Sequence, residues 1–184
     1  MADRIRITRE QGMEALVEPT ISLVNLENGK NNWTFDIGNA PQPEGQQQQG
    51  GSMGAALRDV FAADPNNLVI TLSRAQDTAS PPYNVNLDLG DLGAIEPAFE
   101  AVSARFRDQR FERAVLINNA GVVSPVGTFD QIGAAETGRN LIVNVAAPMV
   151  LSRLFAAATR QNAAQRFIVN ISSGAAKRAI AGWS

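Results

Sequence analysis

Cysteine and histidine are both absent from the 184 residues of this chain. Without cysteine there can be no disulfide, thiolate nucleophile or zinc–thiolate site. Without histidine a Ser-His-Asp triad is impossible, and we expect no metal site, because most transition-metal sites use imidazole. Proton transfer must therefore depend on Asp, Glu, Lys, Tyr or a hydroxyl group, and the chain has one tyrosine, Tyr83.

The chain also lacks a strong charge of either sign and a long apolar run. Its formal net charge is −2, which gives no electrostatic reason to expect nucleic acid or an anionic membrane as a partner. No apolar run approaches the length of a bilayer span, so we expect no membrane segment. The N-terminus is charged from Asp3 onward and has no apolar signal core, which predicts a cytoplasmic protein.

Residues 1–47 differ in pattern from the remainder. Residues 20–26 are β-prone, Asn28-Gly29 signals a turn, and residues 33–37 form a second short β-prone stretch. Together they predict a divergent segment resembling a β-hairpin. A polar, glutamine-rich linker that ends near residue 47 follows. We therefore divide the chain into this segment, 1–47, and a domain over 48–184.

From residue 53 onward, helical and strand patterns alternate. Apolar residues at helical spacing predict helices over 53–61, 92–106 and 134–160, with Asp91 as the N-cap of the second and Phe99, Phe106 and Phe155 in the core. Continuous apolar runs predict buried strands at 68–72, 85–89, 114–117 and 167–171. Strands buried on both faces that alternate with helices predict an α/β fold with a Rossmann-like doubly wound parallel sheet.

Small or polar residues follow each predicted strand. They are Ser73-Arg74, then Asp88, then Asn118-Asn119-Ala120-Gly121, and finally Ser172-Ser173-Gly174. Because ligands of open parallel sheets bind at the carboxyl ends of the strands, these residues predict one ligand crevice.

Several of these motifs resemble those of the short-chain dehydrogenase/reductase family. Asn118 to Gly121 resembles its Asn-Asn-Ala-Gly signature, residues 143–148 its asparagine-bearing helix, and residues 169–173 its serine-bearing strand. Residues 181–184 resemble the approach to its catalytic tyrosine, most closely in sepiapterin-reductase-like and benzil-reductase-like members. Four motifs in order over residues 53–184 are a specific signal. The resemblance implies an NADP-dependent reductase of small ketones or aldehydes.

The resemblance also implies two catalytic roles. Ser173 would hydrogen-bond the substrate carbonyl oxygen, as a small oxyanion site. Asn144 would help to hold a water molecule in the proton relay. The sequence adds a local reason, since Pro148 has no N–H and cannot pair with the carbonyl of Asn144 in an α-helix. The freed carbonyl could bind that water.

The implied cofactor site lies along the same strand ends. The Asn118 to Gly121 loop would lie on the adenosine side of the cofactor, with Asn119, Ala120 and Gly121 in contact with it. Asp88 would accept a hydrogen bond from the adenine amino group, and its neighbour Leu89 would belong to the same site. Arg74, with Ser73 before it, would pair with the 2′-phosphate that distinguishes NADP from NAD. The alternatives are that Arg74 is a solvated surface charge and that the Ser-Ser-Gly stretch is a loop that caps a strand, and for Arg74 we favour the cofactor role.

The expected pyrophosphate loop departs from the family pattern. Its remaining residues would be Gly50, Gly51, Ser52 and Gly54, but Gln48 and Ser52 stand where the family has its first two glycines. The residues before the loop, 41–47, do not form a strand pattern. The central strand of the sheet is therefore either missing or supplied by the hairpin segment.

The Tyr-x-x-x-Lys motif of the family is absent, since by spacing the tyrosine would fall two positions past Ser184. We therefore expect a truncated, inactive chain with an incomplete fold. The apolar surface from Leu141 to Phe155 would be uncovered, which predicts self-association or a homo-oligomer. The alternative is a non-catalytic, Rossmann-like nucleotide-binding or protein-interaction module.

Overall fold

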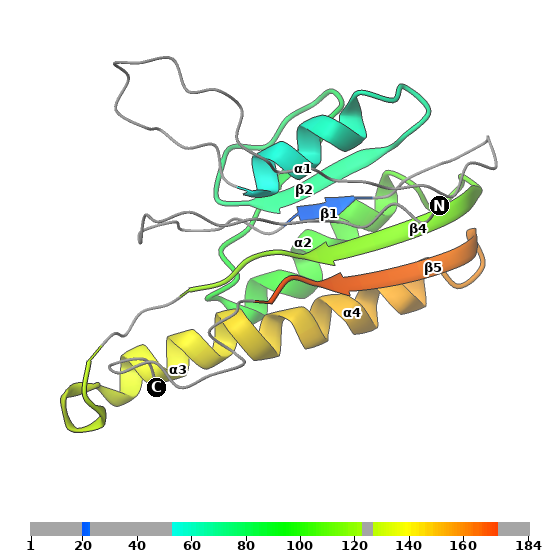
Figure 1. The fold of residues 1–184 in the computed structure, drawn as a ribbon. Coiled ribbons are helices and arrows are strands. Elements are labelled where there is room, and N and C mark those ends of the chain that lie inside the picture. The colour runs from blue at the N-terminus through cyan, green and yellow to red at the C-terminus, as the bar shows by residue number, and fades with distance from the viewer. Residues whose placement is uncertain (1–19, 23–52, 123–126, 173–184) are drawn as a thin grey trace, which may run out of the picture.

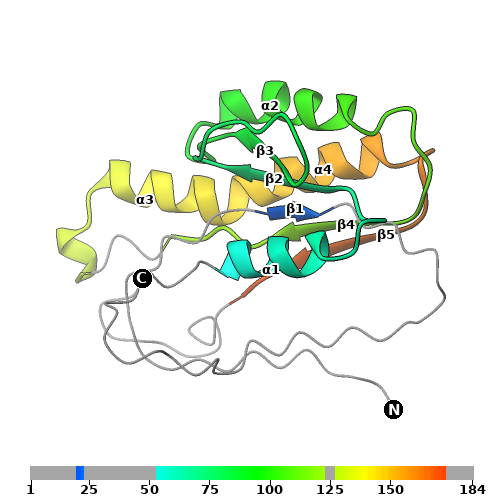
Figure 2. The same cartoon turned by 90° about the horizontal axis from the view of Figure 1, so that it is seen from above.

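The computed structural model describes residues 20–22, 53–122 and 127–172, which form a sheet between layers of helices (Figure 1). The helix α1 covers one face of the sheet, and α2 and α4 cover the other (Figure 2). The elements in chain order are β1 (Thr20–Ser22), α1 (Met53–Ala62), β2 (Val69–Ser73), β3 (Tyr83–Asn86), α2 (Leu92–Ala104), β4 (Phe111–Asn118), η1 (Phe129–Gln131), α3 (Ala134–Leu141), η2 (Ile142–Ala146), α4 (Ala147–Ala158) and β5 (Ala163–Asn170).

The sheet has the strand order β3-β2-β1-β4-β5. β2 pairs with β3 and β4 with β5 in parallel, whereas β1 is antiparallel to both of its neighbours, with Ile21 opposite Ile70 and Leu116. The expected doubly wound parallel sheet is therefore confirmed for β2 to β5, and the central strand, which runs the opposite way, is supplied by the N-terminal segment. The second expected hairpin stretch, 33–37, lies outside the described residues.

Three strands begin earlier than their apolar patterns predict, among them β4, which begins at Phe111 rather than Ala114. β3 begins at Tyr83 and ends at Asn86, so Leu87 and Leu89, expected within the strand, lie beyond its end and are buried in the core. β5 begins at Ala163, because its pairing with β4 starts at Phe111 and continues through polar residues. Backbone pairing thus extends a strand through residues that the apolar pattern does not mark.

The core has one cluster on each face of the sheet. The cluster beneath α1 consists of Leu57, Phe61, Val69 and Ile117. On the other face, the larger cluster includes Ile70 and Leu72 from β2 and the expected core residues Phe99, Phe106 and Phe155. Val69 and Ile70 belong to different clusters because successive side chains of a strand point to opposite faces.

α2 begins where the sequence predicts. The Asp91 carboxylate is its N-cap, and Oδ1 accepts from the backbone N–H of Gly93 at 3.0 Å and of Ala94 at 3.3 Å. These bonds satisfy two of the donors that a helix N-terminus otherwise leaves unpaired.

Residues 134–158, comprising α3, η2 and α4, form one helical stretch of 25 residues that is long and apolar enough to cross a membrane. The expectation that no such stretch exists is therefore wrong by length and composition, because interspersed polar residues interrupt the apolar run without making the segment polar. In this fold one side of the stretch packs inward through Val143, Ala147, Leu151 and Phe155. Leu141, Val145 and Met149 are exposed on another side.

Candidate functional site

The carboxyl ends of β2 to β5 lie along one edge of the sheet, because these four strands run in the same direction. This edge brings together Arg74, Asp88, the Asn118 to Gly121 loop and Asn144, as the sequence predicts. Of the other expected residues, Ser173, Gly50, Gly51 and Ser52 lie outside the described residues.

A buried amide that the sequence analysis did not single out organises the end of β2. Asn84 Oδ1 accepts from the hydroxyls of Thr71 at 2.7 Å and Ser73 at 2.8 Å, and its Nδ2 donates to the carbonyls of Ala75 at 3.0 Å and Gln76 at 3.1 Å. Ser73, an expected cofactor residue, is thus part of an internal network. Thr71, a polar residue within the apolar run of β2, is the signal that could have revealed it.

Arg74 has a fixed backbone and an open side chain. Asn86 Nδ2 donates to the Arg74 carbonyl at 3.0 Å and to the next carbonyl, that of Ala75, at 2.9 Å. The Arg74 side chain is exposed, and its guanidinium has no hydrogen bond or salt bridge to any residue that the structure describes. An exposed cation on a fixed backbone that forms no salt bridge suits an anionic ligand group.

A hollow of about 370 Å³ lies between the first turn of α1 and the end of β2. Gly54, Arg58, Ser73 and Thr78 are among the residues that line it. Gly54 is the one residue of the expected pyrophosphate loop that the structure describes, and it is buried at the start of α1. The N-terminus of α1 suits phosphate oxygens, so this end of the hollow fits a dinucleotide. The Ser73 hydroxyl, by contrast, is bonded to Asn84, and Arg58 lies 2.7 Å from Asp59.

Asp88 follows β3 and is held by neighbours on two sides. Oδ1 accepts from the backbone N–H of Gly90 at 2.8 Å, and the guanidinium of Arg139 on α3 lies 3.0 Å from Oδ2. The Gly90 N–H and then Arg139, with a further contribution from the charge of Arg74, hold the pKa of Asp88 below its ordinary value of 3.8 against the opposing effect of burial. Leu89, by contrast, has its side chain in the core, which leaves only its backbone to a ligand.

The Asn118 to Gly121 loop joins β4 to its surroundings. Asn118 Nδ2 donates to Asn170 Oδ1 at 2.8 Å, and the Asn118 carbonyl accepts from the N–H of Ile171 at 2.9 Å, so the ends of β4 and β5 are bonded together. Asn118 Oδ1 is buried and has no partner among the described residues. Asn119 is also buried, and Ala120 packs against the core.

Asn144 lies in the π-helical turn η2, directly over this loop. Its Oδ1 accepts from the N–H of Val122 at 2.8 Å, and a Cβ added at Gly121 would lie 3.5 Å from the same oxygen. Pro148 has no N–H to offer the carbonyl four residues back, and the turn there is wider than in an α-helix. Such π-turns within α-helices are frequent at functional sites.

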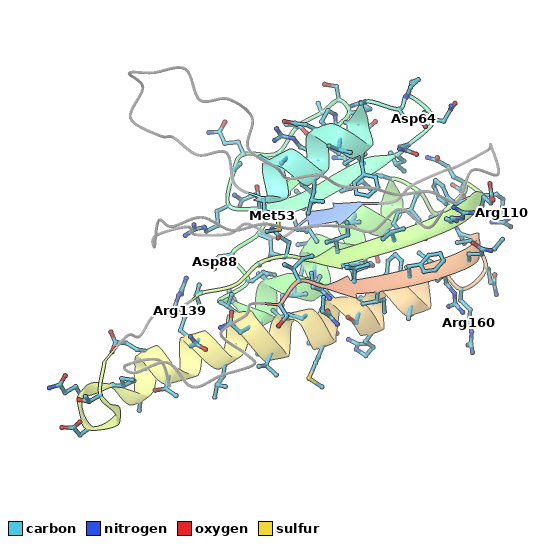
Figure 3. The ribbon with its side chains drawn as sticks, in the orientation of Figure 1. Met53, Asp64, Asp88, Arg110, Arg139 and Arg160 are labelled. Carbon is cyan, nitrogen blue, oxygen red and sulfur yellow. The ribbon has the colours of Figure 1, made fainter. Side chains whose placement is uncertain are left out.

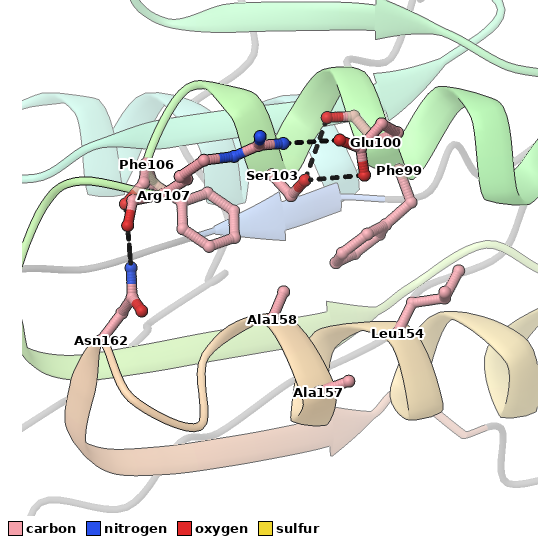
Figure 4. A pocket seen from close by; sticks show the side chains of 9 residues that line it. All are labelled: Phe99, Glu100, Ser103, Phe106, Arg107, Leu154, Ala157, Ala158 and Asn162. Atoms are coloured by element: carbon pink, nitrogen blue, oxygen red, sulfur yellow. Dashed lines mark hydrogen bonds and ion pairs between the residues drawn. The ribbon is translucent and has the colours of Figure 1, made fainter.

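A second hollow, of about 410 Å³, lies between α2 and α4 (Figure 4). Phe99 and Leu154 line it, as does Asn162, whose Nδ2 donates to the Arg107 carbonyl at 2.8 Å. Because Asn162 immediately precedes β5, this hollow is at the amino edge of the sheet. It is therefore remote from the strand ends at which parallel sheets bind cofactors.

Tyr83 also lies away from the candidate site. It is the first residue of β3, and its ring packs under the guanidinium of Arg105, with 4.3 Å from Cζ to the ring centroid. The tyrosine is thus near the amino end of β3, whereas Asp88 follows the carboxyl end. Among the described residues the crevice therefore contains no tyrosine that could act as a general acid.

The sequence and the fold both match known proteins. Residues 52–184 match the family model described as "short chain dehydrogenase". The chain belongs to the short-chain dehydrogenase family. This family consists of oxidoreductases that use nicotinamide dinucleotides, which agrees with the arrangement of residues at the carboxyl edge.

Two curated relatives are benzil reductases that form (S)-benzoin. The protein from Bacillus subtilis is 36% identical over 98 residues, which is 53% of this chain and 40% of the relative. The protein from Bacillus cereus is 30% identical over 129 residues, which is 65% of this chain and 52% of the relative. The chain thus spans about half the length of these relatives or less.

Solved structures share the fold. A short-chain dehydrogenase/reductase from Burkholderia vietnamiensis matches with a TM-score of 0.62 and 30% identity, over 72% of this chain and 66% of that protein. A short-chain dehydrogenase from Streptomyces avermitilis matches with a TM-score of 0.59 and 28% identity, over 70% and 48% of the two chains. The Rossmann-like architecture of this chain is thereby established.

Proposed function

We propose that this chain is the nucleotide-binding part of an NADP-dependent carbonyl reductase. The observation that carries the NADP preference is Arg74, whose guanidinium has no salt bridge to any described residue and whose backbone Asn86 fixes at the end of β2. A guanidinium in this position favours a 2′-phosphate, whereas an acid would favour the free ribose hydroxyl of NAD. Because two relatives of the chain are benzil reductases, we assign a ketone or diketone as its substrate.

Different residues at the carboxyl edge of the sheet bind different parts of the cofactor. The first turn of α1, beginning near Gly54, offers backbone N–H groups to the pyrophosphate. Asp88 accepts from the adenine amino group, and Arg74 binds the 2′-phosphate. The Asn119 to Gly121 loop packs beside the adenosine. When bound, the reduced dinucleotide supplies the hydride that reaches the carbonyl carbon.

Asn144 and Ser173 are assigned to the carbonyl end of the site. Asn144 links the π-turn to Val122 and so fixes the helix beside the loop that follows β4. Its carbonyl, which cannot pair with Pro148, is the group that we assign to hold a water molecule. Ser173 is proposed to donate a hydrogen bond to the substrate carbonyl oxygen.

We further propose that these 184 residues bind nucleotide without turning over a carbonyl substrate. They contain no Tyr-x-x-x-Lys motif, and the one tyrosine, Tyr83, packs against Arg105. General acid catalysis contributes about 10²–10⁴-fold to such a reaction, and a missing lysine would remove cofactor positioning as well. The expected result is therefore binding of NADPH with no measurable reduction of benzil.

The alternative, a non-catalytic nucleotide-binding or interaction module, is favoured by the surface of β5. Phe167, Ile168 and Val169 are 48%, 43% and 38% exposed, and among the described residues β5 pairs with β4 alone. Together with the exposed residues Leu141 and Met149 on the long helix, this surface predicts self-association between copies of the chain. Light scattering across a concentration series tests it, and a monomer at all concentrations would contradict it.

Calorimetric titration with NADP and NAD tests the nucleotide preference. The native chain should bind NADP more tightly, and Arg74→Asp should reduce its affinity for NADP by roughly tenfold to a hundredfold, because a charge-assisted hydrogen bond is replaced by repulsion. Arg160→Asp is the matched control, since Arg160 is exposed just after α4, near the amino end of β5 (Figure 3). Equal affinity of the native chain for both nucleotides would refute the preference.

A further inference from the structure

Asp88 and Arg139 connect two parts of the site that are far apart in the sequence. Arg139 Nη2 lies 3.0 Å from Asp88 Oδ2 and 3.4 Å from Oδ1, so one guanidinium nitrogen contacts both carboxylate oxygens. Figure 3 shows the two side chains together, Asp88 after β3 and Arg139 on α3. The pair thus joins the expected adenine-binding acid to the helical stretch that carries Asn144.

Gly90 gives this pair its geometry. A Cβ at Gly90 would lie 2.7 Å from Arg139 Nη1 and 2.9 Å from Cζ, closer than real Cβ contacts. The guanidinium therefore lies directly against the backbone of the turn whose N–H binds Asp88 Oδ1 at 2.8 Å. A side chain at this position would push Arg139 away from the carboxylate.

The charge of Asp88 matters to Arg74 as well. Arg74 and Asp88 follow the neighbouring parallel strands β2 and β3, in which Ser73 pairs with Asn86, and the charge of Arg74 contributes to the lowered pKa of Asp88. An ionised carboxylate so close to the proposed phosphate site has two adverse effects. It repels a 2′-phosphate, and it competes with that phosphate for Arg74.

We infer that Arg139 is a positioning residue for the NADP preference, which it supports by neutralising Asp88 so that Arg74 remains available to the 2′-phosphate. This inference rests on the proposed function. The hydrogen-bonding capacity of Asp88 and its charge are then separate properties. A carboxylate oxygen can still accept a hydrogen bond from adenine while Arg139 balances the negative charge.

The size of the effect is limited by solvent. The side chains of Arg139 and Asp88 are 56% and 46% exposed, so water and salt screen both charges. We therefore expect Arg139→Gln to lower the ratio of NADP affinity to NAD affinity by roughly threefold to tenfold at low salt. The reduction should shrink in about 1 M salt, where the screening length falls to about 3 Å.

Four variants separate charge from geometry in calorimetric titrations with both nucleotides. Arg139→Gln should lower the affinity ratio, and Arg139→Lys, which keeps the charge, should largely preserve it. The double variant Arg139→Gln with Asp88→Asn should restore the ratio, even though Asp88→Asn weakens the binding of both nucleotides. Arg153→Gln is the control, because Arg153 also forms an exposed salt bridge from the long helix, with Glu96 on α2.

The outcomes distinguish this inference from the function on which it rests. If the native chain prefers NADP and Arg139→Gln, folded by circular dichroism, keeps the same ratio, the inference is wrong and the proposed function stands. If the ratio falls but the double variant does not restore it, Arg139 acts by a route other than Asp88, and the inference is again wrong. If the native chain does not prefer NADP, both proposals are overturned.

Discussion

The side-chain amide of Asn144 pairs with both backbone polar groups of Val122. Asn144 Oδ1 accepts from the Val122 N–H at 2.8 Å, and Nδ2 donates to the Val122 carbonyl at 2.8 Å. The Asn144 side chain thus forms the two hydrogen bonds to Val122, just after β4, that the backbone of a neighbouring strand would form in a sheet. Asn140 Nδ2 also donates to the Val122 carbonyl, at 3.3 Å, so Asn144 binds the N–H of Val122 whereas two amides hold its carbonyl.

Substitution of Asn144 should therefore release Val122. Asn144→Ala removes both bonds and should cost about 1–3 kcal/mol of stability, less the small gain in helix propensity from alanine. Asn144→Gln should behave similarly, because its amide is displaced by one methylene. Hydrogen exchange of the Val122 amide measures the effect directly, and unchanged protection in both variants would show that the pairing is unimportant.

Replacing Asn84 should destabilise the end of β2 far more than replacing an exposed asparagine. Asn84→Ala removes the acceptor of the buried Ser73 hydroxyl and one of the two acceptors of the Thr71 hydroxyl, and we expect a loss of about 2–4 kcal/mol in urea unfolding. Asn66→Ala, at an exposed position, should change stability by less than about 0.5 kcal/mol. Similar losses in the two variants would contradict the structural role of the network.

The long helical stretch should respond in opposite ways on its two sides. Phe155 is 1% exposed, so Phe155→Ala should cost about 3–5 kcal/mol through the cavity that it creates. Met149 is 68% exposed, so Met149→Lys should leave stability nearly unchanged while it weakens self-association. Thermal unfolding and light scattering on both variants check this. A strong loss of stability in Met149→Lys would mean that this side is buried.

Acid should abolish the stabilising contribution of Asp88. Its folded-state pKa lies below 3.8, so its contribution is fully present above that value and is lost as the pH falls through the lower folded-state pKa. The stability difference between the native chain and Asp88→Asn should therefore be constant from about pH 5 to 7 and disappear in stronger acid. A difference that persists unchanged below both pKa values would refute the assignment.

The sequence alone determined the identity and order of most elements. Apolar periodicity predicted α1, α2 and the long helical stretch, and the capping role of Asp91 followed from its place before an apolar-periodic segment. The Asn118 to Gly121 motif and Arg74 could be recognised because strand ends in parallel sheets collect ligand-binding groups. These features are local, so a single stretch of sequence is sufficient to show them.

The tertiary structure decided what depends on residues distant in the sequence. Only the fold shows that Arg139 reaches Asp88, 51 positions away, and that Asn144 reaches Val122, 22 positions away. The direction of β1 was likewise undetermined, because an apolar stretch pairs with equal chemistry in either orientation. Hydrogen bonds and salt bridges of this kind are selected by three-dimensional proximity, which local sequence patterns do not encode.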